Sequence, residues 1–336
     1  MTGKTDNLRS GTKTILAADI GGTNSRFAFF SSDADGNLTL ISDVWLKTTE
    51  AKSFADLLES LKLKGFPLNP EAADIVGIAI AGPIEQNVRS SPPLIPWSVD
   101  ISRYREEFGL KRVFLINDFV AQAYSCLSPV GKAAREILAG SADEDATVAV
   151  IGAGTGLGKA LLVPDSPGSY RVLPSEGAHA DFPFVTSREY EFMEFLTREK
   201  RLARVTCNHV VSGSGLRALH QFLTGERLDP REVAESFAAY PETLSWASRF
   251  YGRACRNFTL ETLALGGLYI AGGIAAKNPG LLTHDAFTEE FYASDTMGQL
   301  LRNIPVRLIE DQNSGLWGVA VMAAIDLSVR GEKQHG

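Results

Sequence analysis

The 336-residue sequence predicts an α/β protein built of two lobes, and three observations support this fold class. A chain of this length exceeds the usual size of a single hydrophobic core. Continuous apolar runs that end at glycine turns recur along the chain, as in the buried strands of a mixed or parallel sheet. A strand, a Gly/Thr-rich turn and a returning strand occur in both halves, which suggests an internally duplicated fold.

Strand and helix signals follow one another along the whole chain. Strands are expected at residues 15–18, 26–30, 39–45, 75–81, 113–116, 147–151, 159–163, 268–271 and 306–309. Helical spacing of apolar residues predicts helices at 53–63, 101–108, from about 120, and at 189–199, 215–223, 230–238, 241–265 and 313–328. We expect a small α/β lobe of residues 14–127 plus 313–330, a large α/β lobe of residues 128–312, and a flexible N-terminal segment of residues 1–13.

The composition excludes several classes of function. The formal net charge is −7 and no block of Lys or Arg stands out, which argues against binding to nucleic acid or to anionic lipid. No apolar stretch approaches the roughly 20 residues of a membrane-spanning helix, and the first residues lack the apolar core of a signal peptide. Cys126, Cys207 and Cys255 are odd in number and far apart, so we expect buried thiols in a cytoplasmic protein.

The first glycine turn, at residues 19–24, has the composition of a phosphate-binding hairpin. Gly21 and Gly22 allow a positive φ and leave no Cβ between the main chain and an anion. Thr23 and Asn24 add a hydroxyl and an amide, and Asp19 offers a carboxylate to a hydrated Mg²⁺. The alternative interpretation is a plain Gly-Gly hairpin with Asp19 as a turn residue.

Two more glycine turns follow predicted strands. One contains Gly154, Thr155 and Gly156, and the other contains Gly272 and Gly273. Three such turns match a nucleoside triphosphate, whose phosphates need N–H donors at close range and whose base needs a flat ledge. A dinucleotide fingerprint fits poorly because no helix signal follows residues 152–158, and the P-loop motif is absent from the sequence.

Polar residues suited to acid–base chemistry and to sugar binding lie at two other places. Asn117 and Asp118 end a predicted strand, where a carboxylate can take a proton from an attacking hydroxyl; the alternative is that Asp118 caps the next helix. Glu176 and His179 suit sugar hydroxyls, with an ordinary surface loop as the alternative. A metal pair there would lack a third ligand. Ser214 is expected to cap the helix that begins near residue 216, and its turn could also contact nucleotide.

Taken together, these segments resemble the bacterial glucokinase family of the actin-like ATPase and sugar kinase superfamily. The matching segments occur in the family's order, span residues 14–327 and comprise residues 19–26, 116–119, 152–158, 173–182, 211–216 and 270–274. The resemblance implies a two-lobed actin-like (ribonuclease H-like) fold, with ATP and a hexose, glucose first of all, meeting in the interlobe cleft. It also implies a homodimer.

The resemblance assigns a role to each matched residue. Asp118 would be the general base for the 6-hydroxyl of the sugar, and Asn117 would hold neighbouring hydroxyls. Glu176 and His179 would bind the anomeric end. Mg²⁺ and the phosphates would bind at Asp19, Thr23, Gly154, Thr155 and Gly156, with Gly21, Gly22 and Asn24 of the first turn beside them. Adenosine would bind at Gly272 and Gly273.

Two departures from the family pattern bear on which sugar is bound. Asn208 stands where the family commonly has a sugar-binding Glu, so a charged acceptor is replaced by an amide. The run Pro92-Pro93-Leu94 stands near Trp97, before which the family usually has a Thr-Asn pair. A kinase for another hexose or amino sugar is therefore one alternative. A non-catalytic sugar-binding regulator is a second, against which the retained Asp118 argues.

Overall fold

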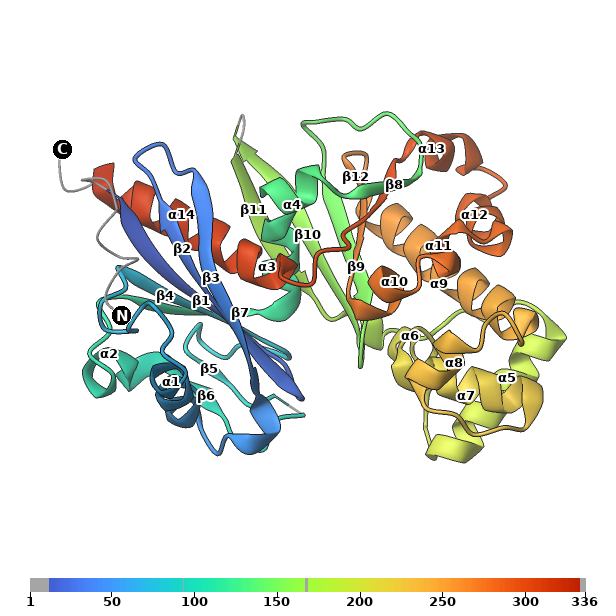
Figure 1. Cartoon of the computed structure of the whole chain (residues 1–336). Coiled ribbons are helices and arrows are strands. Elements are labelled where there is room, and N and C mark those ends of the chain that lie inside the picture. The colour runs from blue at the N-terminus through green and yellow to red at the C-terminus, as the bar shows by residue number, and fades with distance from the viewer. Residues whose placement is uncertain (1–11, 93, 167–168, 333–336) are drawn as a thin grey trace. The chain divides into compact units, whose positions relative to one another are not determined.

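The chain divides into two compact units, of which the first comprises Met1–Lys132 and Asn313–Gly336 and the second Ala133–Gln312. The computed structural model describes residues 12–92, 94–166 and 169–332 (Figure 1). Most of the predicted flexible N-terminal segment, residues 1–11, lies outside the described residues, as does Pro93 of the Pro-Pro-Leu run.

The first unit is built around a five-stranded sheet in the order β3-β2-β1-β4-β7. β1 (Lys13–Ile20), β2 (Asn24–Ser32) and β3 (Leu38–Lys47) are antiparallel neighbours, whereas β4 (Ile75–Ile80) and β7 (Val113–Asn117) run parallel to β1. Ile20, Ile80 and Asn117 are in register, so the carboxyl ends of the three parallel strands meet at one edge. In open α/β sheets such an edge is where ligands bind.

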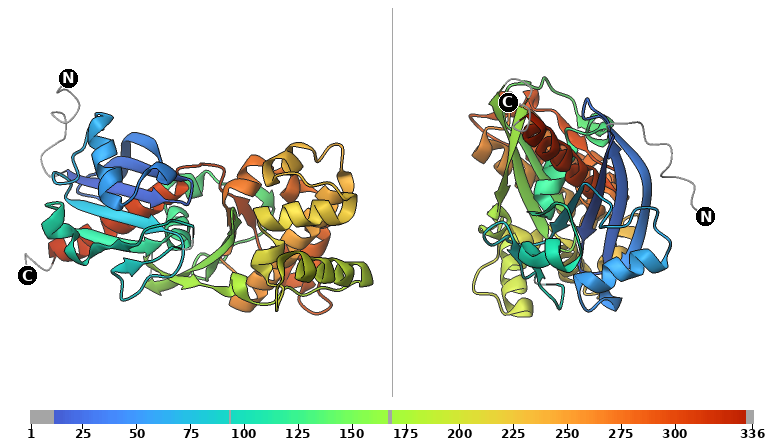
Figure 2. Two further views of the ribbon diagram at one scale, coloured as in Figure 1. Left: turned by 90° about the horizontal axis from the view of Figure 1, so that it is seen from below. Right: turned by 90° about the vertical axis from the view of Figure 1, so that its left-hand side faces the viewer.

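Alternation along β1 divides the core of the first unit into two layers. Leu16, Ala18 and Ile20 pack toward the cluster that contains α1 (Phe54–Leu63). Ile15 and Ala17 pack toward α14 (Ser314–Glu332), which follows the sheet in both views of Figure 2. A helix therefore covers each face of the sheet, and the C-terminal helix completes a core that the N-terminal strands begin.

The second unit repeats this plan around a six-stranded sheet in the order β11-β10-β9-β12-β13-β8. β9 (Val148–Ala153), β10 (Leu157–Ser166) and β11 (Ser169–Ser175) are antiparallel, and β12 (Gly267–Ala271) and β13 (Val306–Leu308) continue parallel to β9. The order of the first five strands matches that of the first unit, as an internal duplication requires. β8 (Arg135–Leu138) adds an antiparallel edge.

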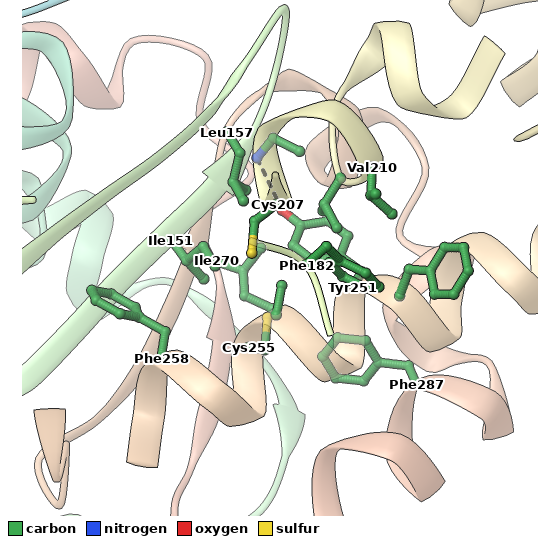
Figure 3. Packing of buried hydrophobic residues seen from close by; sticks show 14 of the residues in the cluster. Ile151, Leu157, Phe182, Cys207, Val210, Tyr251, Cys255, Phe258, Ile270 and Phe287 are labelled. Carbon is green, nitrogen blue, oxygen red and sulfur yellow. Dashed lines mark hydrogen bonds between the residues drawn. The ribbon is translucent and has the colours of Figure 1, made fainter. Parts of the chain in front are cut away.

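Helices pack against the second sheet and bury a large aromatic cluster. The longest helices of this unit are α5 (Ser187–Lys200), α7 (Gly213–Thr224), α9 (Pro241–Thr262) and α12 (Asp285–Tyr292). Figure 3 shows Tyr251 and Cys255 of α9 near Ile151 and Ile270 of the sheet. All three cysteines are buried free thiols, as the sequence predicts.

Short elements complete the described chain. They are η1 (Thr48–Glu50), β5 (Arg89–Ser90), β6 (Val99–Asp100), η2 (Ile101–Arg103), α2 (Tyr104–Glu107), α3 (Asp118–Ser125), α4 (Pro129–Lys132), η3 (Gly177–His179), α6 (Cys207–Val210), α8 (Pro230–Glu235), α10 (Gly273–Lys277), α11 (Gly280–Thr283) and α13 (Gly298–Asn303). No helix among the described residues is long and apolar enough to cross a membrane.

The predicted elements are present, and the corrections concern their ends, the edge strands and several short helices, among them α10, α11, α12 and α13, which were not predicted. The predicted helix 101–108 is a 3₁₀ turn followed by one short α-helix. The helix expected from about residue 120 begins at Asp118, because Asn117 caps it. β8 and β11 were not predicted, and β11 ends at Ser175, directly before Glu176. Val172 is the only buried residue of β11, so the strand lacks the apolar alternation that marks a half-buried strand.

Candidate functional site

The first glycine turn joins β1 to β2 and is closed by its own backbone. The Gly21 N–H donates to the Asn24 carbonyl at 3.1 Å, and the Thr23 carbonyl accepts from the Thr48 N–H at 3.0 Å. Both glycines allow a positive φ, but neither adopts one. Close approach explains them instead: an added Cβ would lie 3.1 Å from the Asn24 oxygen at Gly21 and 2.9 Å from Leu94 Cβ at Gly22.

Asp19 lies at the start of this turn as a largely buried carboxylate. Its Oδ2 is 3.5 Å from Nη1 of Arg26, whose guanidinium stacks 4.2 Å above the Trp45 ring centroid. α14 also approaches closely, since a Cβ on Gly315 would lie 2.8 Å from Asp19 Oδ2. Burial raises the pKa of Asp19, and the nearby Arg26 charge acts in the opposite direction.

The donor set at Asp19 fits a magnesium ion that keeps most of its water. No cluster of three or more His, Cys, Asp or Glu side chains able to hold a metal occurs among the described residues. Mg²⁺ is commonly bound through one or two carboxylates together with substrate phosphates and waters, so a dedicated protein cage is not required. A divalent cation beside Asp19 would also offset the cost of burying its negative charge.

Asn117 and Asp118 lie at the same edge of the first sheet, at the start of α3. Asn117 Oδ1 accepts from the N–H groups of Phe119 at 2.8 Å and Val120 at 3.3 Å, and its Nδ2 donates to the Gly82 carbonyl at 3.0 Å. Asn117 is thus the N-cap of α3, and the alternative that Asp118 is the cap is wrong. Asp118 is the first helical residue, and its Oδ1 accepts from the Phe119 N–H at 3.0 Å.

The second glycine turn, between β9 and β10, is held from outside by the segment around α6 and α7. The Gly154 N–H donates to the Gly156 carbonyl at 2.7 Å, and the Gly154 carbonyl accepts from the Gly213 N–H at 2.9 Å. Asn208 Oδ1 accepts from the Leu157 N–H at 2.8 Å. Thr155 and Gly156 remain exposed at the tip of the turn.

Asn208 therefore has a structural partner that the sequence did not indicate. Its side-chain oxygen is bonded to the glycine turn, which leaves its amide N–H groups as its means of contacting a sugar. A Cβ on Gly156 would lie 2.8 Å from the same oxygen, so the glycine and the asparagine fit one another. Nearby, Ser212 and not Ser214 caps α7, because its hydroxyl accepts from the Gly215 N–H at 3.2 Å.

The third glycine turn lies beside the second, because β12 is the parallel neighbour of β9. Gly272 has φ 91° and ψ 154°, a conformation that is essentially restricted to glycine. A Cβ there would lie 2.8 Å from the Ala153 carbonyl oxygen. Gly273 has no heavy atom within 4 Å of its Cβ position, so the main chain at this point is uncovered by the rest of the unit.

Glu176 and His179 lie together at the end of β11. The His179 N–H donates to the Glu176 carbonyl at 2.9 Å, and the imidazole Nε2 is 3.6 Å from the Glu176 carboxylate. Both side chains are mostly exposed, at 62% and 63%. The pair therefore presents a carboxylate and an imidazole to solvent from one 3₁₀ turn, and such groups can accept and donate hydrogen bonds with hydroxyls.

A buried ion network fixes the chain that follows this turn. The Arg253 guanidinium is only 2% exposed and donates to both oxygens of Glu189 at 2.6 and 3.1 Å. It also donates to Glu290 at 2.8 and 3.1 Å and to the Pro183 carbonyl at 2.9 Å. Burial acts to raise the pKa of Glu189, but the hydrogen bonds and charge of Arg253, together with the backbone N–H bond from Val185, lower it below its usual value, so the network stays ionised.

Comparison with known proteins identifies the family. The family model named Glucokinase matches residues 16–325. The chain belongs to the glucokinase family. It is 31% identical to a glucokinase from a Nostoc species, with 92% of this chain and 98% of the relative covered, and 31% identical to one from Pseudomonas aeruginosa, with 96% and 98% covered.

Solved structures agree with this family and confirm the predicted two-lobed actin-like fold class. A glucokinase from an Antarctic psychrotroph superposes with a TM-score of 0.78 at 30% identity, with 92% of this chain and 98% of that chain covered. A Balamuthia mandrillaris glucokinase in complex with glucose has the same fold at 21% identity, with a TM-score of 0.78 and 94% of each chain covered. The fold is also similar to that of a ROK family glucokinase from Streptomyces griseus, solved with glucose and AMPPNP, at 17% identity, a TM-score of 0.54, and 92% and 98% coverage.

Proposed function

We propose that the protein transfers the γ-phosphoryl group of ATP to the 6-hydroxyl of glucose, giving glucose 6-phosphate and ADP. The observation that carries the proposal is the position of Asp118 at the ligand-binding edge of the first sheet. That edge also carries the turn that begins at Asp19. Membership of the glucokinase family supports the choice of reaction.

Asp118 is the proposed general base. Its carboxylate accepts the proton of the 6-hydroxyl while that oxygen forms a bond to the γ-phosphorus, and the bond from that phosphorus to the bridging oxygen of ADP breaks. Asn117 fixes the position of Asp118, because its side chain ties the start of α3 to the Gly82 carbonyl. In phosphoryl transfer most of the acceleration comes from such positioning and from charge stabilisation.

The nucleotide is assigned to the glycine turns. Thr155 and Gly156 are exposed and present main-chain N–H groups to phosphate, and Gly22, Thr23 and Asn24 do so from the first unit, where Gly21 uses its own N–H to close the turn. Gly272 and Gly273 form the ledge for adenosine, where the absence of side chains lets a flat base approach. Asp19 would hold Mg²⁺ through water, and the ion would neutralise charge on the phosphates.

The sugar is assigned to Asn117, Asp118, Glu176 and His179, with Asn208 contributing through its amide N–H groups. Because residue 208 is an amide and not a carboxylate, the sugar site has one charged acceptor fewer than the family pattern, and the side-chain oxygen of Asn208 is already bonded to the glycine turn. Asn208→Glu is therefore expected to lower KM for glucose. An unchanged or higher KM would show that this position does not contact the sugar.

A coupled assay of ADP release with Mg-ATP tests the function against glucose, mannose, fructose, glucosamine, N-acetylglucosamine and no sugar. Turnover on glucose above the other sugars is expected. Preference for another hexose or amino sugar would change the assigned substrate and leave the assigned reaction, phosphoryl transfer, as it is. Asn208 and the run at Pro92 are the reasons to test these sugars. Sugar binding without turnover would instead favour the regulatory alternative.

The proposal extends to a cytoplasmic homodimer that binds neither nucleic acid nor membrane. The acidic net charge of −7 and the buried free cysteines support this assignment. Light scattering of the purified chain at several concentrations tests the oligomer, since a monomeric mass throughout would contradict it. Fractionation of the source cells tests the location.

A further inference from the structure

Lys159 is a buried ammonium group without a carboxylate partner among the described residues. The residue is 3% exposed and lies on β10, and no Asp or Glu in the part of the chain that the structure describes comes within ion-pair distance of it. Its Nζ donates to the Gly177 carbonyl at 3.4 Å, a long hydrogen bond, and lies 4.7 Å from the centroid of the Phe258 ring. These two contacts compensate a buried charge only in part.

A hollow of about 210 Å³ lies next to this ammonium group. Lys159 lines it together with Gly177, with the chain from Ala180 to Pro183, with Cys207, and with Asn257 and Glu261 of α9. Two of its apolar walls, Cys207 and Phe182, are labelled in Figure 3. All the lining residues belong to the second unit, so the hollow is formed by this unit alone.

The polar groups of the hollow divide into engaged and available ones. The Asp181 carboxylate is bound by the Arg204 guanidinium, which lowers the pKa of Asp181. Asn257 and Glu261 are one helical turn apart and line the hollow from α9. Asn257 Oδ1 accepts from Nε of Arg256 at 3.1 Å, so its amide N–H groups are the donors that Asn257 can offer to a ligand. A positive group thus lies on one wall, and an amide and a carboxylate able to bond hydroxyls lie on another.

We infer that this hollow is a binding site for a small hydroxylated anion, whose carboxylate or phosphate group is held by Lys159 and whose hydroxyls are held by Asn257 and Glu261. If Lys159 only packed against Phe258, methionine would fill the same space without the cost of burying a charge. The volume is below that of ordinary drug-sized pockets, so a nucleotide is excluded and an anion of the size of phosphate or a three-carbon acid fits.

The site is mechanically connected to the sugar-binding turn. Lys159 is the direct cross-strand partner of Ser175, and its hydrogen-bond acceptor Gly177 begins the 3₁₀ turn that carries His179. An anion that takes hydrogen bonds from the ammonium group competes with the Gly177 carbonyl. Binding is therefore expected to change KM for glucose and to leave KM for ATP unchanged, a consequence that rests on the proposed function.

Calorimetric titration of the full chain with inorganic phosphate and with glycerate tests the site, with glucose and a non-hydrolysable ATP analogue filling the assigned substrate sites. Saturable binding is expected for the wild type, at least about tenfold weaker for Lys159→Met, because one charged hydrogen-bond donor is lost. Lys62→Met removes the same charge from an exposed lysine in the first unit and should bind as the wild type does.

Two results would overturn the inference: no saturable binding of either anion by the wild type, or equal affinity in Lys159→Met. If that variant does not fold, Asn257→Asp decides, since it is isosteric and places a further carboxylate in the hollow beside Asp181 and Glu261. Unchanged affinity in Asn257→Asp would then reject the site. A chain that binds the anion but phosphorylates no sugar would refute the proposed function and leave this binding site standing.

Discussion

The two hairpin turns, residues 19–24 in the first unit and 153–157 in the second, share a plan and differ in what holds them. Both connect the first two antiparallel strands of a sheet whose next strand is parallel. The first turn contains a buried carboxylate, Asp19, opposite Arg26. The second contains no charged residue and is held by neutral hydrogen bonds from Asn208 and Gly213.

The two turns therefore suit different ligands, because the first carries a negative charge and the second offers only neutral N–H groups. A buried carboxylate suits a cation, whereas a neutral turn with exposed N–H groups suits phosphate, because it has no negative charge that would repel the anion. Asp118, the proposed general base, also belongs to the first unit. We therefore expect substitutions in the first unit to act on the chemical step and those in the second to act on substrate affinity and on stability.

The largest effect is expected for Asp118→Asn. The amide keeps the size of the side chain but cannot take a proton, so kcat should fall about 10²- to 10⁴-fold, the usual range for a lost acid–base group. KM for glucose should change little because the hydrogen-bonding atoms remain. Steady-state kinetics measure both, and turnover near that of the wild type would remove Asp118 from the role of base.

In the second unit, Gly272→Ala should reduce stability by roughly 1–3 kcal/mol or more, because its φ and ψ are nearly closed to other residues. The added methyl group would also meet the Ala153 carbonyl oxygen at 2.8 Å. Gly273→Ala is the matched control, since its Cβ would meet nothing within 4 Å and alanine favours the helix that begins there. Urea unfolding compares them, and equal midpoints would contradict the conformational argument.

The sequence predicted the two glycine hairpins well and their supports poorly. Glycine pairs after apolar runs identify a strand and a turn from local properties alone, so residues 19–24 and 152–158 were placed correctly. The reason for Gly22 lies in Leu94, and that for Gly156 in Asn208, both distant in the chain. Such contacts exist only after folding, and the periodicity of apolar residues in the sequence does not predict them.

The same limit applies to Asn117 and Asn208. Their positions in the sequence were noticed, but a capping bond and a bond to a turn are set by where other segments arrive. Edge strand β11 was missed for the related reason that its burial comes almost entirely from one residue, Val172. Local patterns therefore indicate which elements form, while support between elements has to be seen in the structure.

A smaller effect is expected when the support of the second turn is removed. Asn208→Ala leaves the partly buried Leu157 N–H without its acceptor, which costs about 1–3 kcal/mol for a buried donor. The turn should loosen, and KM for ATP should rise severalfold while KM for glucose rises less. Asn208→Asp retains the acceptor and serves as the control. A rise confined to the KM for glucose would contradict the supporting role of Asn208 in the turn and leave only its proposed contact with the sugar.

The smallest effect is expected for Asp19→Asn, and its sign is opposite to the others. Burial raises the pKa of Asp19 despite Arg26, so the protonated form is favoured in the folded state, and this contribution to stability is lost as pH rises through the folded-state pKa. The neutral amide avoids that loss. Without nucleotide or Mg²⁺, the free energy of unfolding of the variant should equal that of the wild type below the unfolded-state pKa of Asp19. At neutral pH it should be higher than that of the wild type by about 1 kcal/mol or less, because the variant also loses the partly exposed ion pair with Arg26. Urea unfolding as a function of pH measures the difference. A variant less stable than the wild type at neutral pH would show that Arg26 alone compensates the buried charge of Asp19. The charged turn would then not destabilise the first unit.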